Sequence, residues 1–278
     1  TIKTFFQYLL NSKKTVFFGF AAADFLLLNI FDTTTNTTTI IFMIIKKSLH
    51  FSERRIKMKF SCNTKNLNDA CNNVMRAVST KVTIPTIEGI LMECGSDTLS
   101  LTGYDFEFGI NTIMQATVSE PGAIVINAKV LCDIIRKASS ETVTIETSGT
   151  SVSIIAGAAQ YNIMGIDAQE YPELPSVSGG VPLFVNQHVL QQMVMQTLFA
   201  VADNENSKQV HTGLKFEMSL NQLRLVGVDG YRLAIRTENI KYDGEDISFI
   251  VPKKTIRELI KIIGTDNEKD IQISVGKR

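Results

Sequence analysis

A repeated sequence at a fixed spacing is the feature that most constrains the fold of this chain. Leu99-Ser-Leu-Thr-Gly-Tyr-Asp105 recurs as Leu223-Arg-Leu-Val-Gly-Val-Asp229, displaced by 124 residues. Gly89-Ile-Leu-Met-Glu93 recurs as Gly213-Leu-Lys-Phe-Glu217 at the same displacement. Self-similarity at one period indicates that one structural unit has been duplicated. A fold for this region must therefore contain the same unit twice.

A third match has the same spacing. Ala128-Lys129 aligns with Pro252-Lys253, and an apolar run with helical periodicity follows in both places. We therefore predict two copies of one domain, over residues 58–178 and 179–278, with residues 1–57 outside both copies.

Each copy combines helical and extended patterns. Apolar residues at helical spacing predict helices over 64–78, with Thr64 as N-cap, and over 127–138, 187–201 and 252–263. Gly, Ser, Asp and Asn turns separate β-rich runs over 87–94, 98–104, 106–118, 123–126, 142–147, 151–156, 160–166, 182–185, 213–219, 222–229, 231–238, 247–251 and 271–275. This alternation predicts an α+β fold in which helices pack on antiparallel sheets.

Residues 1–57 differ in composition from the rest. They hold eight Lys and Arg against three Asp and Glu, whereas the remaining 221 residues hold 20 against 25. They also contain nine of the 16 Phe residues and a low-complexity Thr run. This composition is typical of AT-rich DNA read without selection, and Met58-Lys-Phe60 looks like a protein start. Our hypothesis is that the segment is translated upstream sequence.

The alternative for this segment is a membrane anchor within residues 16–45. The apolar run over 16–31 is interrupted by Asp24 and is shorter than the roughly 20 residues that a spanning helix needs. A cytoplasmic protein is the preferred interpretation. Four cysteines without a C-x-x-C pair favour neither zinc nor disulfides, and they fit a reducing compartment.

The motifs of catalysis are absent from the sequence. It contains no G-x-S-x-G, H-E-x-x-H, G-x-x-x-x-G-K-[ST] or G-x-G-x-x-G pattern. Asp243-Gly-Glu-Asp246 has the composition of a turn, and His188 and His211 lack companions at metal-ligand spacing. We predict a binding protein without catalytic residues, metal or cofactor. The alternative is a nucleotide-processing enzyme with an unrecognised site, which a turnover assay on pure protein tests.

Several further motifs follow the repeat in a characteristic order. They are Ile84-Pro85, Glu120-Pro-Gly122, Tyr171-Pro172, Val228-Asp-Gly-Tyr-Arg-Leu-Ala234 and Val251-Pro-Lys-Lys254. On these motifs, residues 58–278 resemble the bacterial sliding clamps, the beta subunits of DNA polymerase III.

The resemblance implies three similar domains per subunit. Two subunits would close head to tail into a homodimeric ring, with helices lining the hole around double-stranded DNA. The third domain and the end of the second are absent, so we expect that this truncated chain does not close the normal ring. The implied function is that of a non-catalytic processivity factor within the polymerase holoenzyme. Implied partners are the DNA polymerase III alpha subunit, the clamp loader and repair proteins, which dock through short linear peptides.

The same resemblance implies two functional surfaces. Phosphates select Lys and Arg, and a ring that slides must not read base edges, so DNA contacts are expected from bases on the helices. By family position the DNA-binding candidates are Lys81, Lys129, Arg136 and Lys208. For each of them the alternative is an ordinary solvated helix face or loop.

The second implied surface is a pocket for partner peptides. Its matching positions are His211, Val228, Gly230, Tyr231, Arg232, Leu233, Pro252 and Ile256. An apolar floor beside the polar rim of Tyr231 and Arg232 suits a Leu or Phe anchor. The alternative is that Asp229-Gly230 is only a hairpin turn and that Leu233 is a core residue.

Overall fold

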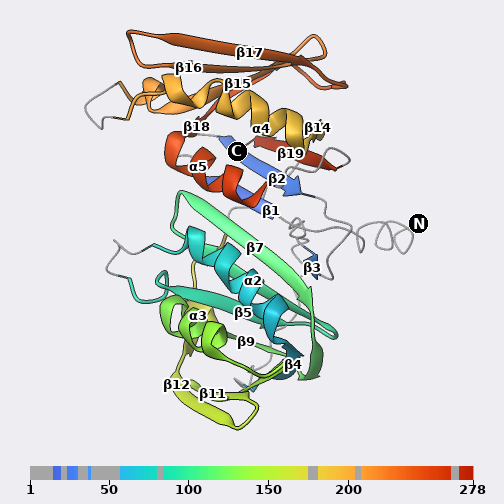
Figure 1. Ribbon diagram of the computed structural model, residues 1–278, viewed down its shortest axis with the longest axis vertical. Helices are drawn as coiled ribbons and strands as arrows, with labels where there is room; N and C mark the ends of the chain where they lie inside the picture. The colour runs from blue at the N-terminus through green and yellow to red at the C-terminus, as the bar shows by residue number, and fades with distance from the viewer. Residues whose placement is uncertain are drawn as a thin grey trace. The chain divides into compact units, whose positions relative to one another are not determined.

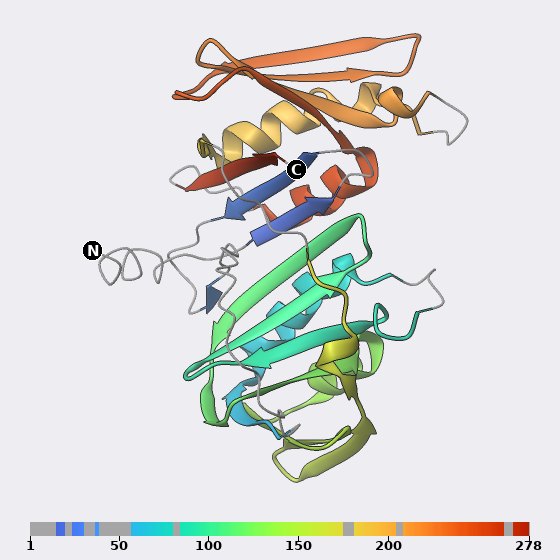
Figure 2. The same ribbon diagram turned by 180° about the vertical axis from the view of Figure 1, so that it is seen from behind.

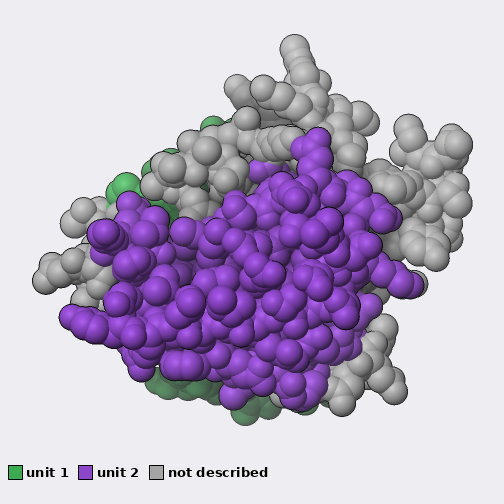
Figure 3. Space-filling model, turned by 90° about the horizontal axis from the view of Figure 1, so that it is seen from above, with its two compact units in different colours: residues 1–15, 32–175 green, residues 16–31, 176–278 purple. Residues whose placement is uncertain are grey.

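The chain forms two compact units in a computed structural model, and each unit is described by itself (Figure 3). Unit 1 contains residues 1–15 and 32–175, and unit 2 contains residues 16–31 and 176–278. The structure describes residues 15–19, 24–30, 37–38, 57–79, 84–174, 181–203, 208–263 and 269–277.

Unit 1 is built from antiparallel strands (Figures 1 and 2). They are β3 (Thr37–Thr38), β4 (Lys59–Asn63), β5 (Gly89–Cys94), β6 (Thr98–Tyr104), β7 (Phe108–Gln115), β8 (Thr117–Glu120), β9 (Gly122–Asn127), β10 (Thr142–Ser148), β11 (Ser151–Ala156), β12 (Ala159–Met164) and β13 (Ile166–Asp167). One set has the order β13-β9-β5-β6-β7, with β3 beside β7, and the other has the order β12-β11-β10-β4-β8.

Helices α2 (Thr64–Val74) and α3 (Ala128–Lys137) pack against each other and against the strands of unit 1. The 3-10 turn η1 (Met75–Ala77) continues α2, so the predicted helix over 64–78 ends in a tighter turn. The N-cap is Asn63 and not the predicted Thr64, because Asn63 Oδ1 accepts a hydrogen bond from Asn66 N at 3.1 Å. An amide side chain at this position satisfies a helix N–H that would otherwise have no partner.

Unit 2 repeats this arrangement. Its elements are β1 (Thr15–Gly19), β2 (Asp24–Ile30), β14 (Leu183–Asn186), α4 (Gln187–Met195), η3 (Leu198–Ala200), η4 (Gln209–His211), β15 (Gly213–Ser219), β16 (Gln222–Val228), β17 (Leu233–Asn239), β18 (Ile247–Pro252), α5 (Lys253–Ile262) and β19 (Asp270–Lys277). The strand orders are β17-β16-β15-β18 and β1-β2-β19-β14. The predicted α+β class with antiparallel sheets is confirmed in both units.

Strand register fixes which residues of the two units are equivalent. Gly89 pairs with Asn127 across β5 and β9, and Gly213 pairs with Pro252 across β15 and β18. Asn127 and Pro252 are therefore equivalent, so the displacement grows from 124 residues at the glycines to 125 at the following helix.

The third match in the sequence was therefore misaligned by one residue. Ala128 N donates to Glu88 O at 3.0 Å, and Lys253 N donates to Thr212 O at 3.1 Å, so these two helix-starting residues are equivalent. Lys129 consequently corresponds to Lys254. The extra residue lies between β17 and β18, because Gln115 and Asn239, which pair with Thr98 and Gln222, still differ by 124.

The glycine of the repeated motif has a packing role in both units. A Cβ added to Gly103 would lie 2.6 Å from the carbonyl oxygen of Val74, and one added to Gly227 would lie 2.4 Å from that of Thr197. Such distances are impossible without movement of backbone, so only glycine permits this approach of helix end and strand. The motif is repeated because the packing is repeated.

The segment after β13 begins as part of unit 1. The short 3-10 turn η2 (Ala168–Glu170) leads to Tyr171, which is buried and packs with Tyr104 and Val125. Burial is the main cause that raises the pKa of the Tyr171 phenol. The hydroxyl donates to Thr102 O at 3.4 Å. The first residues after the sheet are thus fixed by an aromatic anchor.

Within residues 1–57, the structure describes strands β1, β2 and β3 and residue 57. The rest of the proposed membrane segment 16–45 lies outside the described residues. In the described ranges, no helix combines the length and the apolar character needed to cross a membrane. The origin of residues 1–57 stays a prediction.

Candidate functional site

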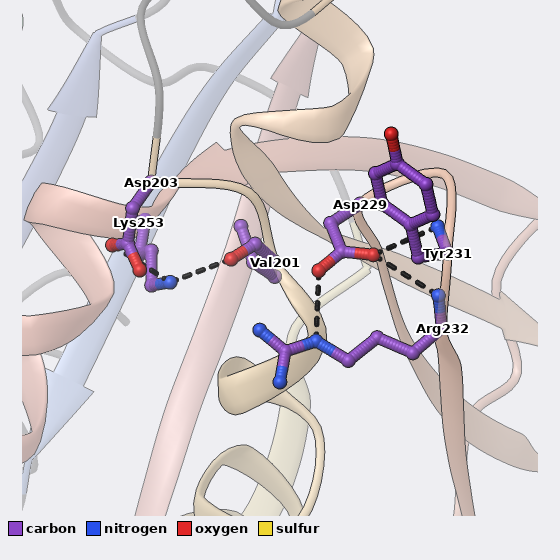
Figure 4. A network of polar contacts seen from close by, with 6 residues as sticks. All are labelled: Val201, Asp203, Asp229, Tyr231, Arg232 and Lys253. Atoms are coloured by element: carbon purple, nitrogen blue, oxygen red, sulfur yellow. Dashed lines mark hydrogen bonds and ion pairs between the residues drawn. The ribbon is translucent and has the colours of Figure 1, made fainter.

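A tight turn joins β16 to β17 in unit 2 (Figure 4). Asp229 Oδ1 accepts hydrogen bonds from the backbone N–H groups of Tyr231 and Arg232, both at 3.0 Å. Its other carboxylate oxygen accepts a hydrogen bond from Arg232 Nε at 2.7 Å. Gly230 has a φ of +94°, which side chains with a Cβ rarely adopt. One aspartate and one glycine therefore fix the course of the chain.

These bonds stabilise the charged carboxylate. Hydrogen bonds from Tyr231 N and then from Arg232 lower the pKa of Asp229 to about 2. Because this value lies below the unfolded pKa of about 3.9, the stabilisation is complete above that pH and is lost only as the pH falls towards the folded pKa. The turn is held throughout the neutral range.

Unit 1 contains the same turn with different exposed residues. Asp105 Oδ1 accepts hydrogen bonds from Phe108 N at 2.7 Å and from Glu107 N at 3.1 Å. Phe106, with a φ of +73°, occupies the position of Gly230. Glu107 and the buried Phe108 replace Tyr231 and Arg232. The turn therefore belongs to the fold. Unit 1 exposes Phe106 there, at 48%, whereas unit 2 exposes Tyr231 and Leu233.

Large side chains are exposed around the unit 2 turn. Tyr231 at the turn is 100% exposed, and Leu233 and Ile235 on one face of β17 are 61% and 55% exposed; we call these three residues the apolar patch. Phe199 of η3 is 56% exposed. The guanidinium of Arg232 lies 5.8 Å from the centre of the Phe199 ring, which links η3 to the turn. Leu233 is thus not the core residue that the alternative interpretation required.

Two predicted pocket residues, Pro252 and His211, lie away from this turn. Val228 pairs with Leu233, but Pro252 pairs with Gly213 at the end of β18. Strands β17 and β18 are opposite edges of this sheet, so Leu233 and Pro252 are about 14 Å apart by interstrand spacing. His211 precedes β15 and is half-buried. The turn gathers Val228, Gly230, Tyr231, Arg232 and Leu233, but not His211 or Pro252.

Ile256, which was predicted in the pocket floor, lies in the core of unit 2. Its side chain is completely buried on α5, which packs on β15 and β18. Its equivalent in unit 1, Leu131, is buried in the same way. Both face the sheet because this helical position belongs to the apolar face, so Ile256 is not part of an exposed surface. Sequence reasoning in turn missed Phe199, which the helical pattern absorbed into the helix over 187–201.

A buried lysine lies beside this region (Figure 4). Lys253 is 8% exposed, and its Nζ donates to Val201 O at 2.5 Å and lies 2.9 Å from Asp203 Oδ1. Arg257 contacts the same carboxylate oxygen at 3.1 Å. The hydrogen bond from Lys253 is the main cause that lowers the pKa of Asp203. These contacts tie the chain after η3 to α5.

We predict that Lys253→Ala destabilises unit 2. The substitution removes the donor for the Val201 carbonyl, and loss of one partner of a buried polar pair costs about 1–3 kcal/mol. Chemical denaturation measures the change. Lys254→Ala, on the exposed neighbour, is expected to change stability by less than about 0.5 kcal/mol. Equal stability of the Lys253 variant and the parent chain would show that the contacts are dispensable.

Basic side chains are exposed along the helices. On α3, Lys129 and Arg136 are exposed, and Arg136 pairs with Asp133. On α5, Lys254 and Lys261 are exposed at the equivalent positions, and Lys261 pairs with an acid three residues earlier at 2.6 Å. The duplicated helix therefore keeps two exposed bases and one ion pair in both units.

Charge is segregated between helices and the remaining chain. Helices α2 to α5 with η1 hold nine Lys and Arg against three Asp and Glu. Elsewhere, residues 58–278 hold 11 against 22. Helix α4 holds no Asp, Glu, Lys or Arg, so the basic surface comes from α2 with η1, α3 and α5.

The remaining candidates are less defined. Lys208 is exposed immediately before η4, and Lys81 lies outside the described residues. All four cysteines are buried free thiols. Over the described part of the chain, no three His, Cys, Asp or Glu residues form a cluster that could hold a metal ion.

Comparison with known proteins gives consistent matches. Two family models match: the N-terminal domain of the DNA polymerase III beta subunit over residues 58–175, and the central domain over residues 184–278. The beta sliding clamp of Bacillus subtilis is 31% identical over 229 residues, which are 78% of this chain and 60% of that protein. The beta sliding clamp of Synechococcus elongatus is 33% identical over 211 residues, 74% of this chain and 56% of that protein.

A solved structure agrees with these matches. The DNA polymerase sliding clamp from Bacillus subtilis superposes with a TM-score of 0.74 at 27% identity, covering 79% of this chain and 64% of that chain. This chain thus spans about 60% of the length of the curated relatives it matches.

Proposed function

The chain belongs to the family of DNA polymerase III beta subunits, and from this premise we propose that it serves in a DNA sliding clamp. Such a clamp encircles duplex DNA and keeps the replicative polymerase attached. The single observation that best supports this function is the segregation of charge, with nine bases against three acids on the helices of an otherwise acidic region. Phosphates attract such a surface without selecting a sequence.

We propose that the candidate DNA contacts serve sliding rather than base recognition. Lys129 and Arg136 lie on the exposed side of α3, and Lys208 is exposed immediately before η4. Lysine and arginine at these positions provide long, mobile charges that exchange between phosphates. We propose the same role for Lys81. No chemical step is required, because retention comes from enclosure of the duplex.

We propose that the apolar patch receives partner peptides. Tyr231 and Leu233 provide exposed apolar area at a rigid turn, and Arg232 provides polar contacts at its rim. An aromatic and aliphatic surface of this kind suits a short peptide with Leu or Phe anchors. The candidate partners are the DNA polymerase III alpha subunit, the clamp loader and repair proteins. In the full-length protein, a head-to-tail homodimer would complete the ring.

The proposed function is tested by topology. The full-length protein with its third domain, loaded by its own clamp loader, is expected to stay on nicked circular DNA and to leave after the circle is cut by a restriction enzyme. A gel-filtration assay of labelled protein with DNA measures retention. The control is the same circle with protein but without loader. Equal retention on circular and linear DNA would contradict enclosure of the duplex.

A further inference from the structure

Strands β1 and β2 occupy a defined place in unit 2 (Figures 1 and 2). Unit 1 has the strand order β12-β11-β10-β4, and unit 2 has the order β1-β2-β19-β14. Strands β4 and β14 are equivalent because each leads directly into an Asn N-cap, Asn63 for α2 and Asn186 for α4. Strands from the beginning of the chain therefore occupy the places that β11 and β12 hold in unit 1.

The register confirms this equivalence. Cys62 pairs with Val143 in unit 1, and Val185 pairs with Ile271 in unit 2, so Val143 and Ile271 are equivalent. By the same counting, Ile273 is equivalent to Ile145. Strands β10 and β19 are therefore equivalent residue by residue where they pair with β4 and β14.

The other side of β19 repeats the register of unit 1 as well. Ile145 pairs with Ile154 of β11, and its equivalent Ile273 pairs with Leu28 of β2. Both pairings are antiparallel, and Leu28 thus stands at the register position of Ile154. Leu26 and Ile30 stand in the same way at the positions of Val152 and Ala156.

These positions are the buried ones in unit 1. Val152, Ile154 and Ala156 are 0%, 0% and 5% exposed. The partners of Ile30, Leu28 and Leu26 on β19 are Ile271, Ile273 and Val275, which are 0%, 1% and 6% exposed. Strand β2 supplies Leu26, Leu28 and Ile30 at these three positions, so the face that corresponds to the buried face of β11 is entirely apolar. The alternating positions of the strand include Phe25 and Leu27, so the run has apolar residues on both faces.

We infer that strands β1 and β2 are donor strands that complete the second sheet of unit 2. The edge of β19 accepts an apolar strand, and its occupant is β2 of the same chain. An unpaired edge with buried apolar residues is unstable in water, because its N–H and C=O groups and its apolar face both lack partners. Strands β1 and β2 are then an integral part of the fold of unit 2.

Hydrogen exchange on the full chain tests this inference. Leu28→Asp introduces a charge at the position equivalent to a buried residue, and exchange of the amides of residues 271–275 is expected to increase by about 100-fold. The matched control is Leu27→Asp, one position along and equivalent to the partly exposed Ser153, with an expected increase below about 3-fold. The amides of β10 serve as an internal reference and are expected to be unchanged.

A cross-link distinguishes register from general destabilisation. Leu28→Cys with Ile273→Cys places two thiols directly opposite each other, a geometry that permits a disulfide, and oxidation is expected to join them. Leu27→Cys with Ile273→Cys places them on opposite faces, and no cross-link is expected. The native cysteines are all buried and leave the background low. Absence of the first cross-link, or equal exchange in the Leu28→Asp variant and the parent chain, would overturn the inference.

Discussion

Replacing Lys129, Arg136 and Lys254 together with glutamate is expected to weaken the binding of this chain to duplex DNA by about 100-fold at physiological salt. All three side chains are exposed on α3 and α5, and Lys129 and Lys254 are equivalent in the two units. Each lost phosphate contact removes one released counterion. The dependence of log affinity on log salt is therefore expected to become shallower by about 2.7. Fluorescence anisotropy across a salt series measures both quantities.

The matched control changes net charge by the same amount on the strands. Lys59, Lys215 and Arg224 lie on β4, β15 and β16 and pair with Glu146 and Glu217. Their replacement by glutamate is expected to reduce affinity by less than about 3-fold, because long-range charge effects are screened within about 8 Å at this salt. If both triple variants bound DNA equally weakly, net charge and not the helix surface would account for binding.

The fold was predictable where local pattern and tertiary packing agree. Strands β6 and β15 have the predicted bounds because each alternates apolar residues between turn residues. Helices α2 and α4 end earlier than predicted, and the 3-10 turns η1 and η3 follow them. The change of helix type occurs where the backbone at the helix end lies close to Gly103 or Gly227. Apolar periodicity continues through such a change of helix type, so it does not reveal it.

The N-terminal strands were not predictable in the same way. The composition of residues 1–57 indicated sequence without selection, but β2 pairs with β19 at the opposite end of the chain. Pairing at such separation depends on which edge is available, and the local sequence contains no information on that edge. The comparison with β11 becomes visible only when strand order is known.

The candidate site was only partly predictable for a similar reason. Asp229 and Gly230 indicated a turn, which the structure contains twice. The sequence did not reveal that Pro252 lies across the sheet or that Ile256 faces the core. The resemblance to the family assigned these residues to one pocket, but it gave no information on the strands that lie between them. Phe199 had no signal beyond its place in a helical pattern.

Leu233→Asp is expected to weaken the binding of a peptide with a Leu or Phe anchor by about 30-fold or more, the loss typical of a central interface residue. Leu233 is 61% exposed at the end of β17, so the charge does not enter the core. The free energy of unfolding should change by less than about 0.5 kcal/mol. Isothermal titration with a polymerase tail peptide measures affinity, and thermal denaturation checks the fold.

The same substitution elsewhere on the sheet provides the control. Leu220 is 89% exposed in the turn between β15 and β16, and Leu220→Asp is expected to leave peptide affinity unchanged. This pair of variants differs in place but not in chemistry. Unchanged affinity of the Leu233 variant would remove the apolar patch as a docking surface. Equal losses in both variants would show that the peptide responds to charge, because Leu220 and Leu233 lie at opposite ends of their strands.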